Sequence, residues 1–255
     1  MKKFVVMSWV LLAGFWGFTD VALAHNRHYV WTEEYRTLPR NTFELEGKTT
    51  LKVPDAGKSN ENTWKYEPEL EYGITDHWNI AHYQIWETEN QSGFDDAGVK
   101  RKDPTRYEGF KFESKYRIGE KGKYWVDPLV YLELESEVRP EHRNNTIEGK
   151  LVLSKDFQKF NVTYNQIIES QADRGGRTTH EYSIAVNYEI LSSLFIGCEM
   201  NGQYWQPSSH RNEIGLGPTV GYANQYFWVA AGVLIGANEA ADDLQARVSV
   251  GIPIG

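Results

Sequence analysis

The most constraining feature of this sequence is an alternation of apolar and polar residues that recurs along most of its length. In the segment 110–118, Phe110, Phe112 and Tyr116 alternate with charged side chains. A period of two places apolar side chains on one face of an extended strand and polar side chains on the other. The pattern therefore predicts an all-β chain of amphipathic strands.

Twelve segments carry this pattern. Each is about as long as the ~9–11 residues that a tilted strand needs to cross a bilayer. Strands of ordinary globular proteins average only about five to six residues, so the lengths favour membrane-spanning strands. We expect strands at residues 42–53, 63–74, 77–88, 106–118, 125–137, 145–155, 158–170, 178–190, 193–205, 210–222, 225–236 and 243–254.

The connections between these segments alternate between short turns and longer polar loops. Thr75-Asp76 is an example of a short turn, and residues 89–105 form the longest loop. Outer-membrane barrels have short periplasmic turns and longer extracellular loops. The sequence therefore predicts an antiparallel transmembrane β-barrel of about 12 strands over residues 42–255. A soluble periplasmic β-protein is the alternative fold.

The first 24 residues have the features of an export signal. Two lysines precede an apolar run, and Ala22-Leu23-Ala24 is a small-x-small cleavage site. We expect cleavage after Ala24 and location in the outer membrane of a Gram-negative bacterium. Residues 25–41 are too polar for a lipid-facing strand, so this segment lies either in the periplasm or in the barrel lumen as a plug.

Charge and cysteine content exclude several classes of function. The formal net charge is −8, which disfavours nucleic-acid binding because that function needs a basic face. Cys198 is the only cysteine, so the chain has neither a disulfide framework nor a cysteine-based zinc site. We expect no cofactor.

The polar face of the predicted strands is rich in charged residues of both signs. Opposite charges on adjacent strands would interlock across the lumen. Two interpretations stay open: the ion pairs fill a narrow barrel, or they line a pore selective for cations or polar solutes. The predicted lumen-lining residues are Lys65, Glu67, Glu69, Glu71, Lys111, Glu113, Lys115, Arg117, Glu133 and Glu135.

Aromatic residues gather near the ends of the predicted strands, where interfacial girdles of membrane barrels lie. The alternative is that they belong to the core of a soluble barrel. The chain lacks the terminal aromatic residue of many outer-membrane barrels. The residues assigned to the girdles are Trp64, Trp78, Tyr107, Trp125, Tyr204, Trp205, Tyr222, Tyr226 and Trp228.

Three motifs carry a resemblance to a known group of proteins. The segment 35–46 (YRTLPRNTFELE), the hairpin 69–78 (ELEYGITDHW) and the strand 112–117 (FESKYR) resemble uncharacterised exported barrels. Those barrels are related to the transporter-like proteins of phenol-degradation (MetA-type) clusters. Arg40-Asn41 stands where lysine-glycine is usual in that group. The resemblance implies an outer-membrane location and passage of small molecules, and it implies no catalytic residues.

Isolated residues that suggest catalysis or metal binding form no complete motif. Ser208-Ser209-His210 lies in a predicted outer loop, but a catalytic pair needs a third orienting group. His25 with His28, and His77 with His82, lack the ligand count of a metal site. Asp95, Asp96 and Asp103 could bind calcium, but the favoured interpretation of the loop 89–105 is a solvated, mobile loop. We therefore expect neither an enzyme nor a metal site.

The sequence thus predicts a passive channel or transporter-like protein for small polar or aromatic molecules. The alternative is a closed barrel with a structural, adhesive or lipid-acting enzymatic role through its outer loops. The expected partners are outer-membrane lipid, the barrel assembly machinery and a small-molecule solute, and we expect no nucleic acid.

Overall fold

The computed structural model describes most of the chain after residue 26. The described residues are 27–58, 60–90, 104–139, 144–172, 176–205 and 212–254, with the backbone alone at 204 and 205. The predicted signal peptide and its cleavage site lie outside these residues. Among the described residues, no helix is long and apolar enough to cross a membrane.

Among the described residues, twelve β-strands make up the fold, and one short 3-10 turn, Ala56–Lys58, follows the first of them. The predicted strands are confirmed, with ends that differ by three residues or fewer. The strands are β1 (Phe43–Val53), β2 (Asn62–Thr75), β3 (Trp78–Asn90), β4 (Arg106–Arg117), β5 (Asp127–Glu137), β6 (Asn145–Phe157), β7 (Phe160–Gln171), β8 (Thr178–Leu191), β9 (Leu194–Trp205), β10 (Glu213–Ala223), β11 (Trp228–Gly236) and β12 (Leu244–Ile254).

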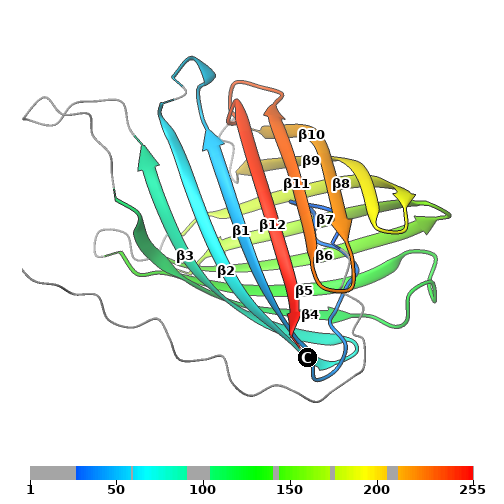
Figure 1. Cartoon of the computed structure of the whole chain (residues 1–255). Helices are drawn as coiled ribbons and strands as arrows, with labels where there is room; N and C mark the ends of the chain where they lie inside the picture. The colour runs from blue at the N-terminus through cyan, green and yellow to red at the C-terminus, as the bar shows by residue number, and fades with distance from the viewer. Residues whose placement is uncertain are drawn as a thin grey trace, which may run out of the picture.

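The strands close into one antiparallel barrel (Figure 1). Each strand pairs with its neighbours in sequence, and β1 pairs with β12 along its whole length, from Phe43 opposite Ile254 to Val53 opposite Leu244. Closure leaves no strand edge with unpaired backbone groups, which is the condition for a sheet to span lipid.

Outward and inward side chains follow the predicted alternation. On β5, Val130, Leu132 and Leu134 are each more than two-fifths exposed, whereas Tyr131 and Glu133 between them are buried. The same exposed apolar face recurs around the barrel on β1 to β12. Apolar side chains outside and polar ones inside are the arrangement of a barrel whose outer wall contacts acyl chains.

Loop lengths differ between the two ends of the barrel. At one end, called here the short-turn end, β2 joins β3 through residues 76–77 and β8 joins β9 through residues 192–193. The other end, called here the long-loop end, holds the connections from β1 to β2, from β3 to β4 and from β11 to β12. The C-terminus lies at the short-turn end (Figure 1).

The core of the molecule is the inside of the barrel. The described residues 27–38 run through this interior, and Tyr29, Val30 and Thr32 have no exposed surface. Two short apolar clusters hold this segment against the wall. Val30 packs with Ala223, Trp228 and Ala230, and Tyr35 packs in a second cluster with Leu129, Tyr131 and Val152.

Candidate functional site: the barrel lumen

All ten residues predicted to line the lumen are buried or half-buried on the inner face of β2, β4 and β5. The backbone register explains their proximity, because Lys111 lies opposite Glu135, and Glu113 lies opposite Glu133. The ammonium of Lys111 lies 2.9 Å from both the Glu133 and the Glu135 carboxylate. The ten residues thus come from one wall of the interior.

Two ion-pair groups form on this wall. In the first, Lys65 contacts Glu67 at 3.2 Å, and Lys111 lies 3.8 Å from the same carboxylate. In the second, Lys115 lies 2.9 Å from Glu71 and 3.0 Å from Glu113.

Arg117 lies apart from both groups, at the short-turn end, where its guanidinium donates to the Asp76 carbonyl at 2.5 Å. Glu69 also lies outside them and pairs at 2.8 Å with Lys48, a residue outside the predicted set.

Sequence reasoning missed the charged inner face of β1. Glu44, Glu46 and Lys48 alternate with the outward-facing Phe43 and Leu45, so the period-two signal was present there. Both glutamates are buried, with at most 2% of their surface exposed. They form the part of the wall that receives the N-terminal segment.

The N-terminal segment enters and leaves the lumen at the short-turn end. Thr37 donates its hydroxyl to the Asp76 carbonyl, and the Leu38 amide donates to the Asn79 side chain. The returning part reaches the same end, because the Tyr29 hydroxyl donates to Asn161 in the β6–β7 turn region and the His28 ring packs on Phe195. Residues 27–38 therefore form a re-entrant loop, called here the luminal loop.

The tip of the luminal loop is held by Glu199 of β9. Its carboxylate accepts three backbone hydrogen bonds, from Val30 at 2.6 Å, Trp31 at 2.8 Å and Thr32 at 2.7 Å. Charge-assisted hydrogen bonds of this kind are about twice as strong as neutral ones. Nothing in the local sequence around Glu199 distinguishes it from other inward acids, so sequence reasoning missed it.

Arg36 of the luminal loop contacts three buried carboxylates at once. Its guanidinium lies 3.1 Å from Glu44, 3.0 Å from Glu46 and 4.0 Å from Glu71. These carboxylates are close enough to one another to share a metal ion. The guanidinium supplies their positive charge instead, so the cluster anchors the loop and does not present a vacant cation site.

Glycines on the inner wall leave room for the luminal loop. A Cβ at Gly232 would lie 2.7 Å from the Trp31 ring, and one at Gly221 would lie 3.0 Å from the Arg27 carbonyl. Any larger side chain at these positions would collide with the docked segment. The wall of β10 and β11 is thus shaped to the luminal loop.

A cavity of about 380 Å³ lies between the luminal loop and the long-loop end. Trp31 lines it together with inner-wall residues of β1, β6 to β12 and the β11–β12 connection. Volumes of 300–1,000 Å³ are typical of small-molecule sites. Its acidic and basic lining residues are Lys52, Glu148, Lys150, Glu181, Glu213, Asp242 and Arg247.

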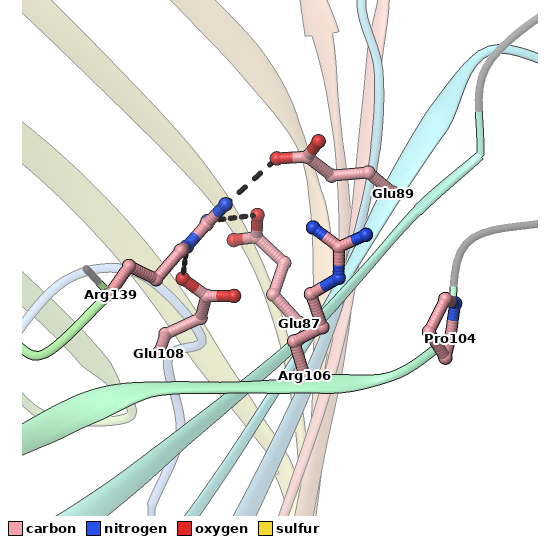
Figure 2. A pocket seen from close by; sticks show the side chains of 6 residues that line it. All are labelled: Glu87, Glu89, Pro104, Arg106, Glu108 and Arg139. Atoms are coloured by element: carbon pink, nitrogen blue, oxygen red, sulfur yellow. Dashed lines mark hydrogen bonds and ion pairs between the residues drawn. The ribbon is translucent and has the colours of Figure 1, made fainter. Parts of the chain in front are cut away.

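A second charged cluster lies near the long-loop end of β3 to β5 (Figure 2). Arg139 contacts Glu87 at 3.5 Å, Glu89 at 3.8 Å, and Glu108. Figure 2 shows the three carboxylates converging on this guanidinium, with Arg106 beside them. The space among them is about 10 Å³, which has room for no more than about one water molecule. The cluster therefore joins three strand ends and is not a ligand pocket.

One residue assigned to the aromatic girdles is placed wrongly. Trp228 has no exposed surface, faces the interior and donates its indole N–H to Glu44. The alternation of β11 explains the error, because Trp228 has the same inward phase as Ala230 and Leu234, and a position at a strand end does not by itself turn a side chain toward lipid. Trp78, Trp125 and Tyr226 are exposed, as a girdle requires.

The other residues considered for chemistry are dispersed. His28 contacts Glu34, His77 contacts Glu120, and His82 contacts the Lys111 carbonyl. His25, the loop aspartates 95, 96 and 103, and the segment Ser208-Ser209-His210 lie outside the described residues.

The Glu34 carboxylate has a perturbed acidity because of its place in the luminal loop. It accepts hydrogen bonds from the His28 amide at 2.6 Å and the Tyr29 amide at 3.0 Å, and its other oxygen lies 2.9 Å from the His28 ring. Burial alone raises the pKa of this carboxyl, but the contacts with His28 outweigh burial and lower the pKa to about 2. The charged form of Glu34 therefore favours the docked loop.

The sequence matches one described protein family over most of its length. Residues 21–238 match the family described as "Family of unknown function (DUF6662)". The chain belongs to this family. Among curated proteins, nothing matches.

Several solved structures with a similar fold are outer-membrane channels or porins. The COG4313 outer membrane channel from Pseudomonas putida F1 superposes with a TM-score of 0.64 at 9% identity, over 89% of this chain and 100% of that one. The NanC porin gives 0.53 at 11% identity, over 82% and 98%. The KdgM porin, solved with disordered oligogalacturonate, gives 0.53 at 12% identity, over 84% and 98%. At such identities the likeness establishes the barrel fold alone.

Proposed function

We propose that this DUF6662 member is a passive outer-membrane channel for small polar molecules, with its luminal loop acting as the constriction. The observation that carries the proposal is the charged interior of the barrel. A cavity of about 380 Å³ lies toward its long-loop end, and the luminal loop occupies the interior toward the short-turn end. The short-turn end would then face the periplasm and the long-loop end the exterior, as in other barrels of this kind.

The resemblance to transporter-like proteins of phenol-degradation clusters extends this proposal to small aromatic solutes. The family match and the shared fold with channels are compatible with that extension, which rests on the three sequence motifs alone. Cleavage of the leader after Ala24, a non-enzymatic role and contact with the barrel assembly machinery belong to the same proposal.

Planar-bilayer recordings test the channel directly. The mature chain should give discrete conductance steps, and a variant lacking residues 26–40 should give larger steps because the luminal loop is gone. Circular dichroism and a gel-mobility shift on boiling verify that both proteins are folded. An absence of steps from both proteins across several salts would remove the channel proposal.

The occupied lumen also favours a second candidate, a closed barrel that acts through its outer loops. The burial of the luminal loop is the specific observation behind it, because Tyr29, Val30, Thr32 and Glu33 lie inside the barrel with at most 8% of their surface exposed. Under this alternative, the variant lacking residues 26–40 conducts and the complete chain does not, under any voltage or pH.

A further inference from the structure

The cavity between the luminal loop and the long-loop end is lined by charges of both signs, and three of these charges are compensated or engaged within the protein. Lys150 lies 3.1 Å from Glu148, so these two charges compensate each other. Glu213 is engaged with a partner of its own. The lining charges that remain for a ligand are those of Lys52, Glu181, Asp242 and Arg247.

Glu181 of β8 gives one part of the cavity wall a negative charge. Its carboxylate accepts a hydrogen bond from the neutral Gln203 amide at 3.0 Å and makes no ion pair with the described residues. The residue is half-buried, so part of it stays accessible. A carboxylate has about four acceptor positions, so Glu181 can accept further hydrogen bonds from a cationic group of a ligand.

Lys52 of β1 and Arg247 of β12 give another part of the wall a positive charge. Lys52 is exposed, and its ammonium makes no hydrogen bond or ion pair with the part of the chain that the structure describes. The half-buried Arg247 guanidinium donates to the Thr50 hydroxyl at 2.8 Å and to the Val30 carbonyl at 3.2 Å. Both of these acceptors are neutral, so the charge of the guanidinium is not compensated by them.

The two parts of the wall are too far apart to neutralise each other. Asp242 belongs to the basic part, because it accepts a hydrogen bond from Gln245 at 3.0 Å, and Gln245 lies opposite Lys52. It offsets one of the two cations there and leaves the other. In the closed strand order, β9, β10 and β11 separate β8 from β12. Four spacings of about 4.8 Å place the two parts about 19 Å apart along the wall, with the cavity between them.

We propose that this cavity binds a small zwitterion with a primary ammonium and a carboxylate on one short chain. Glu181 accepts the ammonium hydrogens, and Arg247 and Lys52 bind the carboxylate. A ligand with one charge alone is attracted by one part of the wall and repelled by the other. The proposal rests on the channel function in one respect, since it makes the cavity the binding station of the transported solute. The binding itself requires no conduction.

Ligand-observed saturation-transfer NMR on the complete mature barrel in a nonionic detergent tests the chemical class. The probes are 4-aminobutyrate, butyrate and butylamine, which share a four-carbon chain and are zwitterionic, anionic and cationic near pH 7. We expect 4-aminobutyrate to give transfer signals that depend saturably on its concentration. Butyrate and butylamine should each bind at least about tenfold more weakly, because each leaves one part of the wall unmatched.

Two variants with opposite effects locate the binding in this cavity. Glu181→Gln should weaken 4-aminobutyrate binding about tenfold and make butyrate a better ligand than butylamine. Lys52→Gln should also weaken 4-aminobutyrate, by about threefold to tenfold, and make butylamine the better of the two. A general loss of structure would not shift the charge preference in opposite directions. The matched controls are Glu137→Gln and Lys58→Gln, which remove the same charges near the long-loop end from residues outside the cavity lining. The heat-dependent gel shift verifies that each variant is folded.

The outcomes separate this inference from the channel proposal. Binding of 4-aminobutyrate that the cavity variants weaken and the controls leave unchanged supports the inference, whatever the conductance. Absence of 4-aminobutyrate binding overturns it even if the barrel conducts, and so does a preference of the unaltered barrel for butyrate or butylamine. Equal weakening by the control variants would overturn the location.

Discussion

Glu199 is the residue that ties the tip of the luminal loop to the barrel wall. Both of its oxygens accept hydrogen bonds from consecutive backbone amides, so the carboxylate holds the main chain of the loop. Because backbone amides are common to all residues, the contact depends on the shape of the loop and not on the identity of its side chains.

The first residue-scale prediction concerns this contact. Glu199→Gln keeps the size of the side chain but turns one acceptor into a donor that faces an N–H group. The local docking free energy should fall by about 2–3 kcal/mol, so exchange of the Val30 and Thr32 amides should accelerate about thirtyfold or more. Glu169→Gln, which removes an inward charge away from the loop, should leave that exchange unchanged. Unaltered exchange in Glu199→Gln would contradict the assigned role.

The second residue-scale prediction concerns Arg36. Arg36→Met removes the cation among Glu44, Glu46 and Glu71 and leaves buried carboxylates uncompensated. The unfolding free energy of the barrel in micelles should fall by about 3–5 kcal/mol, as measured by urea denaturation. Arg40→Met, at an exposed position, is the matched control and should change little. Equal stability of the two variants would show that the carboxylates do not need the guanidinium.

At the scale of single elements, β4 contains a bulge that positions one of its acids. The register shifts between Ile85–Gly109 and Trp86–Tyr107, so Glu108 is the extra residue on β4. The shift lets Tyr107 pack outside on Trp86 while Glu108 reaches the cluster around Arg139. Bulges commonly re-aim a side chain in this way.

The bulge gives a prediction with a matched control. A Cβ at Gly109 would collide with the Ser136 carbonyl, a backbone atom that cannot rotate away, whereas a Cβ at Gly149 on β6 meets nothing. Gly109→Ala should therefore destabilise the barrel by about 2 kcal/mol or more, and Gly149→Ala should be neutral or slightly stabilising. Urea denaturation in micelles measures both. A neutral Gly109→Ala would show that β4 and β5 separate without cost.

The luminal loop should respond to acid. The pKa of Glu34 is lowered to about 2 in the docked loop because the His28 contacts outweigh burial, and the pKa of Glu33 is also lowered, by Lys115 and Arg27 against burial. Carboxyls with lowered pKa stabilise docking fully above their ordinary value of about 4.5 and lose that contribution as the pH falls toward 2. Single-channel conductance should rise between pH 4.5 and pH 2.5 in the complete chain. The variant lacking residues 26–40 should show no such rise, and an equal rise in both would assign the effect to the wall.

The strands were predictable from the sequence because their signal is local. Alternating residues determine which side of the sheet a side chain occupies, and lipid outside with water inside makes that signal sharp on β2, β4 and β5. The luminal loop was not predictable in the same way. Whether this segment lies in the lumen or in the periplasm depends on contacts such as that of Val30 with Glu199. Such contacts join residues far apart in sequence and have no periodic pattern.

Trp228 shows where the periodic signal ends. Its place at a strand end suggested an interfacial residue, but the alternation of β11 directs Trp228 inward with Ala230, and the indole lies beside Glu44. The cavity was not predictable either, since it is the volume left between the luminal loop and the wall. The sequence could identify acids such as Glu67 and Glu133, but not which of them face open space.

At the scale of the whole molecule, the outer wall is an apolar belt closed on itself. Exposed Leu, Ile, Val and Phe side chains recur on strands around the complete circumference. The mature protein should therefore require detergent for extraction from membranes and should migrate differently on gels before and after boiling, because a closed barrel resists unfolding by detergent. A protein that stays monomeric in aqueous buffer without micelles would contradict the membrane assignment.

The re-entrant course of residues 27–38 has a consequence for how the protein can be handled. Thr37 and Leu38 lie beside the β2–β3 turn, and His28 packs on Phe195 at the start of β9. Both arms of the luminal loop therefore reach the short-turn end of the barrel. Polypeptide attached ahead of Arg27 therefore need not thread through the bore. A reporter fused ahead of Arg27 would lie outside the barrel at the short-turn end. A pulling force on that reporter would extract the luminal loop through the same opening.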